Sequence, residues 1–165
     1  ESISNALDIA LSEADLAQIK EELMQSGYIR RKHTKKKVKL TSKPMHYISS
    51  DGYDMYVGKN NLQNEELTFS FANGNDWWFH AKQAPGSHVI VRTNGAELPD
   101  TTFEEAARLA AYYSSMRGSD KVEIDYVEKK QVKKPGGGKP GFVVYYTNYS
   151  MVIDSNISQI RLCAD

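Results

Sequence analysis

The stretch "DWWFHAKQAPGSHVIV", residues 76–91, decides the fold, because two strand-like runs flank a Pro-Gly turn. Side chains alternate between the faces of a strand, so the first run divides into two sets. The sets are Asp76, Trp78 and His80 on one face, and Trp77, Phe79 and Ala81 on the other. We expect strands over 76–82 and 87–92, with one face in the core. If they pair as a hairpin, His80 and His88 lie near each other.

Upstream, the run "MHYISSDGYDMYVG" places two alternating segments around Asp51-Gly52. This pair of turn residues predicts a β-hairpin. The next run, "KNNLQNEELTFSFANGND", is ambiguous, because "LTFSF" alternates like a strand whereas Leu67 and Phe71 share a helical face. We favour a short helix that an asparagine caps.

Downstream, "TTFEEAARLAAYYSSMRG", residues 101–118, predicts the main helix. Thr102 and Glu105 form a capping box, Arg117 lies in the last turn, and Gly118 ends the helix. Its four alanines permit close approach to a sheet: Ala106, Ala107, Ala110 and Ala111.

Three further strand-like runs follow, and the loop "PGGGKPG" lies between the first two. They are "KVEIDYVEKKQVKK", "FVVYYTN" and "YSMVID". The predicted fold is therefore α+β, a mostly antiparallel sheet of about six strands with one main helix.

The N-terminal part has a different character. Leu16, Ile19 and Leu23 give residues 12–26 one narrow helical stripe, typical of the tail of a coiled coil. We expect the end of a coiled-coil helix over 1–29, a basic linker or arm over 30–43, and the α+β domain over 44–165. We also expect a segment of a longer cytoplasmic protein: the chain begins at Glu1, has one cysteine, and has no apolar run of the roughly 20 residues that span a membrane.

The net charge is zero, but the basic residues are unevenly distributed. Residues 30–39, the first basic island, and residues 129–139, the second, hold twelve of the 21 Lys and Arg residues and no acidic residue. Their members are Arg30, Arg31, Lys32, Lys35, Lys36, Lys37 and Lys39, and Lys129, Lys130, Lys133, Lys134 and Lys139. Such local positive charge favours a polyanionic partner.

The polar residues of the opening stretch allow two interpretations. Asp76, His80 and His88 offer three of the oxygen and nitrogen donors that a metal site requires. The alternative, which we favour, is structural: one histidine donates to a backbone carbonyl or to Asp76, and the other lies at the surface or in the turn. Ser87 adjoins His88 too closely along the chain to form a nucleophile-base pair with it. We predict no catalytic residue, metal or cofactor.

Nucleic-acid binding fits the pattern better. Lys and Arg neutralise phosphates, and exposed aromatic rings stack on unpaired bases. Four of the ten tyrosines lie close along the chain to the first basic island: Tyr28, Tyr47, Tyr53 and Tyr56. The alternative is a solvated charge run without a partner. Two separate islands, one of which includes a glycine-rich loop that lets backbone approach a phosphate, make that alternative weaker.

Three motifs make the chain resemble the NFACT-R domain, the C-terminal domain of the ribosome quality-control family that includes the bacterial fibronectin-binding-protein-A-like factors, RqcH and NEMF. The motifs are Gly58, Lys59, Asn60, Asn61 and Asn64; Asp76, Trp78, Phe79 and His80; and Pro85, Gly86, Ser87 and His88. "GYIRRK" and "VKKPGGGKPGFVVYYTNY" extend the resemblance to about residues 12–155. Trp77 departs mildly, since the family often has another apolar residue there.

The resemblance implies a non-catalytic RNA-binding module of a factor that engages obstructed large ribosomal subunits carrying peptidyl-tRNA. Ribosomal RNA and tRNA are the implied partners, with NFACT-N and coiled-coil domains upstream in the same chain. We expect the two islands with Lys59, Asn60 and Asn61 to contact RNA, and the remaining motif residues to be structural or ligand-facing. Reversing the charge of Lys133 and Lys134 would then weaken binding. A fibronectin-binding adhesin and a metal-dependent nuclease are the alternatives.

Overall fold

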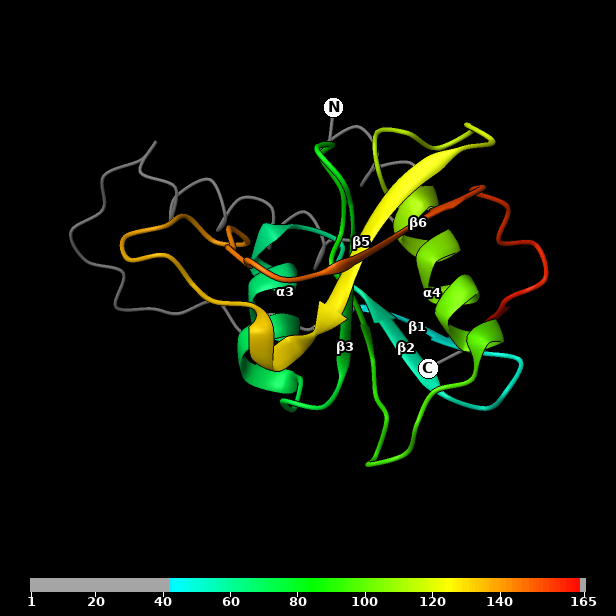
Figure 1. Cartoon of the computed structure of the whole chain (residues 1–165), viewed down its shortest axis with the longest axis horizontal. Helices are drawn as coiled ribbons and strands as arrows, with labels where there is room; N and C mark the ends of the chain where they lie inside the picture. The colour runs from blue at the N-terminus through cyan, green and yellow to red at the C-terminus, as the bar shows by residue number, and fades with distance from the viewer. Residues whose placement is uncertain (1–41, 164–165) are drawn as a thin grey trace.

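The alternating runs form one antiparallel sheet of seven strands in the computed structural model, which describes residues 42–163 (Figure 1). The strands are β1 (Met45–Ile48), β2 (Asp54–Val57), β3 (Trp77–Ala81), β4 (Val89–Val91), β5 (Val122–Glu128), β6 (Tyr149–Ile153) and β7 (Arg161–Leu162). Their order across the sheet is β6-β5-β3-β4-β2-β1-β7. This confirms the α+β prediction, and the two-residue strand β7 is the one that sequence reasoning missed.

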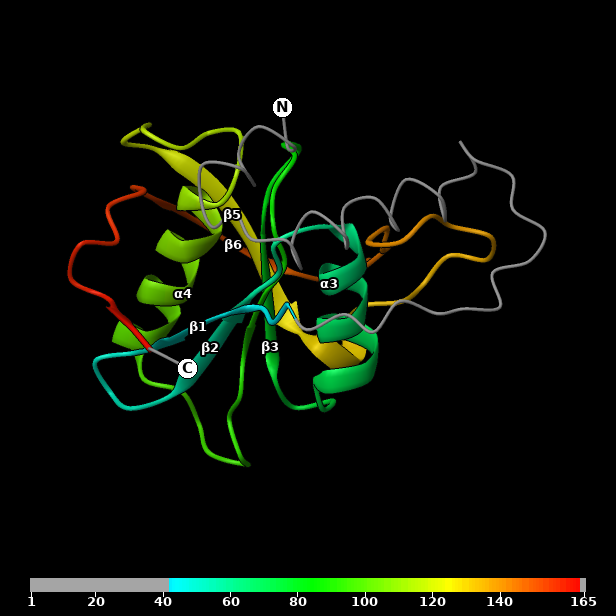
Figure 2. The ribbon, with the colours of Figure 1, turned by 180° about the vertical axis from the view of Figure 1, so that it is seen from behind.

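Helices cover both faces of this sheet. The main helix, α4 (Asp100–Tyr112), packs on one face, and α3 (Asn61–Glu66) lies across the other (Figures 1 and 2). The π-helix η1 (Leu67–Phe71) continues α3, and the 3₁₀ helix η2 (Lys129–Gln131) follows β5. The short helix favoured for residues 59–76 is therefore confirmed.

Strand β3 carries core side chains on both faces, which corrects the expectation of a single buried face. Phe79 and Ala81 lie in a large cluster beneath α4, as do the four alanines of that helix. Trp78 is 1% exposed and packs in a second cluster with Leu67, Ile90, Val127 and Val132. The second face is shielded from solvent, because η1 and the segment after β5 cover it.

The predicted capping box of α4 is wrong. The helix begins after Pro99, which makes no side-chain capping bond. Thr102 and Glu105 instead bond to the β1–β2 turn: the Thr102 hydroxyl donates to Asp51 Oδ2 at 2.8 Å, and Glu105 Oε1 accepts from the backbone N–H of Ser50 at 2.8 Å. Polar residues at helix-capping spacing thus hold a hairpin against the helix.

Helix α4 also ends earlier than predicted, at Tyr112 rather than at Gly118. The backbone of the next residues pairs with the Pro-Gly turn: Ser87 N–H donates to Tyr113 O, and Ser115 N–H donates to Pro85 O, each at 2.9 Å. These bonds draw the chain away from the helix axis, so tertiary pairing ends the helix.

The run "FVVYYTN" was predicted to be a strand and is not one. Its pairing is limited to the isolated bridge between Lys133 and Val144, because the segment crosses over the α3 side instead of joining the sheet. Residues 1–41, with the expected coiled-coil end, the first basic island and nearly all of the arm, lie outside the described residues. Among residues 42–163, no helix is long and apolar enough to cross a membrane.

Candidate nucleic-acid interface

The strand-turn-strand run forms the predicted hairpin, with Trp78 opposite Ile90 and Phe79 opposite Val89. It brings the two histidines together as expected: the ring centroids of His80 and His88 are 5.6 Å apart and the rings are perpendicular. Trp78 stacks parallel to His80 at 5.7 Å and meets His88 edge-on at 5.3 Å. The three rings form one packed unit on the α3 side of the sheet.

His88 is buried, so it is not the histidine that was expected at the surface or in the turn. Its Nε2 lies 3.1 Å from the carbonyl oxygen of Gly141, which can only accept, so Nε2 carries the proton. Nδ1 then accepts from the Thr68 hydroxyl at 2.7 Å. Burial, and next the neighbouring His80, lower the His88 pKa to about 3. The ring is therefore neutral and joins η1 to the loop after β5.

This burial predicts a loss of stability in acid. The unfolded chain takes up the His88 proton near pH 6.5, whereas the folded chain takes it up only near pH 3. Between these values the unfolded state binds more protons, so the free energy of unfolding falls as pH is lowered from about 6.5 to about 3. Urea denaturation across this range measures the slope, and the non-titrating variant His88→Asn is expected to flatten it. An equal slope in the variant would assign the effect to other groups.

His80 contributes in the same direction. Burial is the main cause that lowers its pKa, and its Nδ1 donates to the carbonyl of Ala81 at 2.6 Å. This contact matches the favoured structural interpretation, in which one histidine bonds to a backbone carbonyl. His80→Asn is therefore the second variant for the same pH series.

Asp76 takes part in a separate set of contacts. Its carboxylate accepts from the backbone N–H groups of Thr93 and Asn73 at 3.0 and 2.8 Å, and it pairs with Arg92 at 3.1 Å. Asp76, His80 and His88 do not converge, and residues 42–163 hold no group of three His, Cys, Asp or Glu side chains that could bind a metal ion. The aspartate instead fixes the ends of β3 and β4.

The Gly58–Asn64 run joins the start of α3 to the hairpin. Asn60 caps α3, since its side chain accepts from Gln63 N–H at 3.0 Å. Asn64 Oδ1 accepts from His88 N–H at 3.0 Å, and Gly58 N–H donates to His88 O at 3.2 Å. A Cβ on Gly58 would lie 2.0 Å from Asn64 Oδ1, so glycine is required for this approach. The Gly58–Asn64 motif and the Pro85–His88 motif are therefore hydrogen-bonded to each other through the His88 backbone, and together they form the support for the loop described next.

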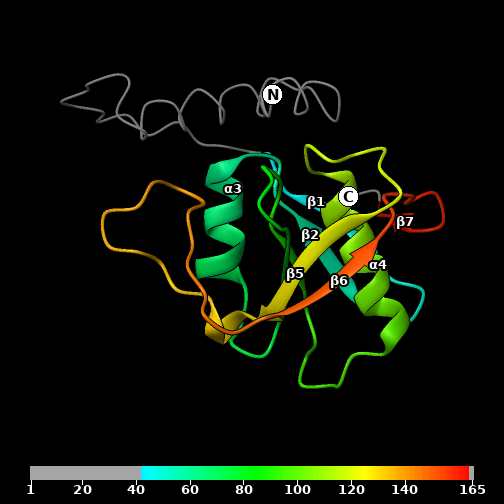
Figure 3. The same cartoon turned by 45° about the horizontal axis from the view of Figure 1, so that its top comes forward.

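The glycine-rich part of the second basic island lies against this support. Glu65, on α3, accepts from Lys134 Nζ at 2.9 Å and from Gly141 N–H at 2.8 Å. Lys134 also donates to the carbonyl of Lys139 at 2.8 Å. Lys134 therefore holds the loop closed across its own base, and Figure 3 shows the loop extending beyond α3.

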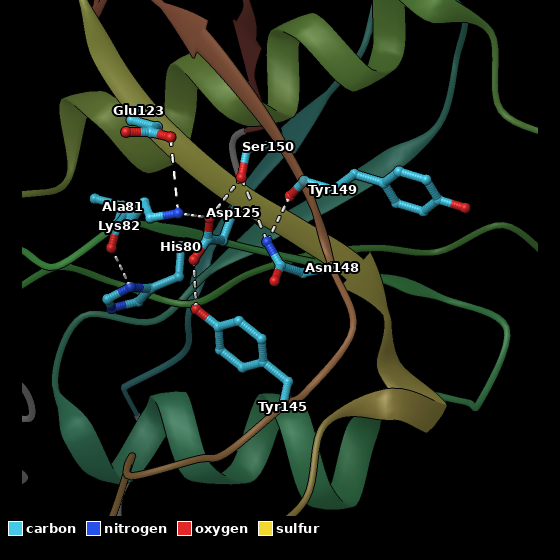
Figure 4. Close-up of polar contacts among 9 residues, drawn as sticks. All are labelled: His80, Ala81, Lys82, Glu123, Asp125, Tyr145, Asn148, Tyr149 and Ser150. Atoms are coloured by element: carbon cyan, nitrogen blue, oxygen red, sulfur yellow. Dashed lines mark hydrogen bonds and ion pairs between the residues drawn. The ribbon is translucent and has the colours of Figure 1, made fainter.

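A polar network fixes the chain as it returns from this loop to the sheet (Figure 4). Asp125, a buried residue of β5, accepts from the hydroxyls of Tyr145 and Ser150 at 2.7 and 2.8 Å. Lys82 Nζ lies 3.8 Å from the same carboxylate. Burial and the bond to Asp125 raise the pKa of Tyr145, so its hydroxyl remains a donor at neutral pH. The loop is thereby held at its end as well as along its flank.

The lysines of the second island differ in what they contact. Lys130 pairs with Glu128 at 3.4 Å, and Lys129 lies over the Phe69 ring at 5.7 Å. Lys133 and Lys139 are exposed, and neither ammonium has an ion-pair partner within residues 42–163. These two lysines are the members of the island best placed to meet an external anion.

Two exposed aromatic side chains accompany them. Phe142 is 57% exposed and Tyr146 is 87% exposed. Sequence reasoning missed both, because it assigned their segment to a strand, although large aromatics beside a lysine-rich glycine loop are themselves a signal. Tyr47, by contrast, is buried against Tyr113 and is not available for stacking.

The remaining predicted contact residues fall into two groups. Asn61 adjoins the loop, since a Cβ on Gly141 would lie 3.1 Å from its Oδ1, so the motif around Lys59, Asn60 and Asn61 borders the second island. The first island lies outside the described residues. Sequence analysis did not find the residues that position the loop, because nothing in a linear pattern pairs an acidic helix residue with a distant loop. These residues are Glu65, Thr68, Asp125 and Tyr145.

Comparison with known proteins agrees with this geometry. Residues 43–146 match the family model described as NFACT protein RNA binding domain. Two relatives named Rqc2 homolog RqcH, from Streptococcus suis strain 05ZYH33 and Bacillus subtilis strain 168, are 46% and 42% identical over 144 and 147 residues, or 85% and 86% of this chain. The chain spans 26% and 25% of the length of these curated relatives.

A solved structure is also similar. The C-terminal part of the fibronectin/fibrinogen-binding protein from Streptococcus suis has a TM-score of 0.83 and 42% identity, over 98% of this chain and 65% of that one. The family match covers well over half of the chain, including all three sequence motifs and the lysine-bearing loop. The chain therefore belongs to the NFACT protein RNA binding domain family.

Proposed function

We propose that this chain is a non-catalytic RNA-binding module of a ribosome quality-control factor that engages obstructed large ribosomal subunits carrying peptidyl-tRNA. The observation that carries the proposal is the loop of the second island. Internal bonds of Glu65 and His88 hold it in place, while Lys133 and Lys139 remain exposed at its surface. The relatives named Rqc2 homolog RqcH support the ribosomal setting.

The physical logic is one of preorganisation. A loop already held in its binding conformation loses little conformational entropy when it meets RNA, so the phosphate contacts are not offset by ordering. Exposed Tyr146 and Phe142 add rings on which unpaired bases stack. We expect ribosomal RNA or tRNA to lie along this loop and the neighbouring Lys59–Asn61 run, and the first basic island to extend the contact. Upstream NFACT-N and coiled-coil domains and a cytoplasmic location complete the proposal.

Fluorescence anisotropy with labelled tRNA, ribosomal RNA fragments and duplex DNA tests the function. Each phosphate contact is expected to contribute about 0.7–0.9 to the slope of log affinity against log salt. Several contacts and a preference for RNA support the proposal. A flat salt dependence, or equal binding of duplex DNA, contradicts it.

The double variant Lys133→Glu/Lys139→Glu is expected to weaken RNA binding at least about tenfold and to reduce the salt slope by about two contacts, because both lysines face solvent. Lys134 is left unchanged, since its replacement would also disturb the loop through Glu65. Lys121→Glu, at an exposed site just before β5, is the control for a charge reversal outside the island. Equal affinities of the double variant and the control would remove the second island from the interface.

Fibronectin binding is a second candidate, favoured by the similar structure from a fibronectin/fibrinogen-binding protein. It predicts binding to immobilised fibronectin that survives high salt and nuclease treatment. The nuclease alternative has less support, because its three candidate ligands do not converge within the described residues.

A further inference from the structure

A second surface feature lies on the α4 side of the sheet, away from the lysine loop. It is a cavity of about 470 Å³ between α4, β3, β5 and the edge strand β6. Aromatic rings and two carboxylates line it: Trp77, Phe103, Tyr126 and Tyr149, with Asp100 and Glu104. A cavity of this size is within the usual range for binding sites.

The aromatic rings form a continuous wall. The centroid of Trp77 is 4.9 Å from that of Phe103, 5.9 Å from that of Tyr126 and 6.0 Å from that of Tyr149. Tyr126 and Tyr149 are 5.6 Å apart. Tyr149 is 60% exposed, so this wall is open to solvent on the β6 side. Faces of Trp and Tyr rings carry negative electrostatic potential and attract cations.

The carboxylates make the same side of the cavity acidic. Asp100 and Glu104 are one helical turn apart on α4, so they project from the same face of the helix. Neither has an ion-pair partner in the part of the chain that the structure describes. Burial is the main cause that raises the pKa of Tyr126, followed by the nearby Tyr149 and Asp100. The negative charge of Asp100 therefore acts on the Tyr126 hydroxyl. The two negative charges are expected to repel phosphate groups.

We propose that this cavity binds an arginine side chain presented by an extended segment of a partner polypeptide. A guanidinium stacks flat on aromatic rings and pairs with carboxylates in a planar fork, which matches the two kinds of lining group. The complementary charges of arginine and of the Asp100–Glu104 pair favour a protein segment over RNA.

The edge strand β6 supplies a place for the backbone of that segment. β6 pairs with β5 on one side and is the last strand of the sheet on the other. Val152, which is 61% exposed, belongs to this strand and also lines the cavity. An added strand gains main-chain hydrogen bonds while its side chains enter neighbouring pockets.

The cavity is separate from the RNA-binding loop, because the two sites occupy opposite faces of the sheet. Tyr145 and Asp125, which fix the lysine loop, bond on the α3 side, and Figure 4 shows the Tyr149 ring directed away from them. One domain is thus able to contact RNA and a protein segment at the same time.

Titration with the peptide Ac-Thr-Val-Arg-Val-Thr-NH₂ tests the site by NMR. The chain has two tryptophans, so the indole N–H signal of Trp77 is expected to shift, while that of buried Trp78 serves as the internal reference. The same peptide with citrulline in place of arginine keeps the shape and removes the charge, and it is expected to bind at least about tenfold more weakly.

The double variant Asp100→Asn/Glu104→Gln is expected to weaken binding of the arginine peptide at least about fivefold. Asp120→Asn, an exposed acid outside the cavity, is the matched control and should bind normally. RNA affinity should be unchanged in both variants. Equal binding of the citrulline peptide, equal affinity of the double variant, or displacement of the peptide by RNA would overturn the proposal. Dimerisation in analytical ultracentrifugation that the Tyr149→Ala variant abolishes would also overturn the proposal, because the occupant of the cavity would then be a second copy of this chain.

Discussion

Replacing Asp76 with alanine is expected to lower the free energy of unfolding by about 3–5 kcal/mol, as for one partner removed from a buried ion pair. The Asp76 side chain is 2% exposed; its two oxygens accept from two backbone N–H groups, and one of them also forms an ion pair with Arg92. Alanine leaves those N–H groups without this acceptor and the largely buried Arg92 guanidinium without this counter-ion. The ends of β3 and β4 should then separate, since Thr93 follows β4 and Asn73 precedes β3.

Urea denaturation measures this loss, and two variants separate its causes. Asp76→Asn keeps an acceptor oxygen but removes the charge, so we expect it to be less harmful than alanine. Asp120→Ala, at an exposed acid, should change stability by no more than about 0.5 kcal/mol. A loss below about 1 kcal/mol for Asp76→Ala would mean that water replaces the carboxylate and that the network has no structural role.

Gly58→Ala is expected to lower the free energy of unfolding by about 2–6 kcal/mol. The added Cβ would lie 2.0 Å from Asn64 Oδ1 and 2.9 Å from its backbone nitrogen, so either α3 or the asparagine side chain must move. Overpacking of this kind costs about 1–3 kcal/mol, and an unsatisfied His88 N–H adds about 1–3 kcal/mol. Because α3 carries Glu65, RNA affinity should fall together with stability.

Thermal or urea denaturation checks the stability, and anisotropy checks the binding. Gly136→Ala is the matched control: it lies in the lysine loop, and a Cβ there meets nothing within 4 Å. The combination Gly58→Ala/Asn64→Ala should cost less than the sum of its parts, because both remove the same bond to His88. Strict additivity would contradict the shared contact.

Local signals predicted the elements of this fold whose causes are local. The Asp51-Gly52 hairpin and the pairing of 76–82 with 87–92 follow from turn residues and alternation, and the α3 cap follows from Asn60. Helix α4 was correctly found, but both of its ends were wrong because distant segments compete for its polar groups. Thr102 bonds to a hairpin turn, and Tyr113 pairs with the Pro-Gly turn.

The candidate interface was predictable in outline only. The uneven distribution of charge indicated the second island, but it did not distinguish Lys133 from Lys134. The structure does, because Lys134 forms an ion pair with Glu65. Alternation in residues 142–148 predicted a strand, and this prediction is wrong. The hydrogen bond from Tyr145 to Asp125 diverts the chain, and the sequence does not reveal this bond because the two residues lie on different segments. Such pairings depend on three-dimensional proximity, which one sequence does not display.

The pairing of β1 with β7 has a consequence for the order in which the domain assembles during synthesis. Tyr47 pairs with Leu162, and Cys163 N–H donates to His46 O at 2.8 Å, so the first strand of the described chain is covered by the last. A nascent chain can close the hairpin of β1 and β2 early, but it can protect the outer edge of β1 only after residues 161–163 have left the ribosome. Until then this edge is open to pairing with another chain.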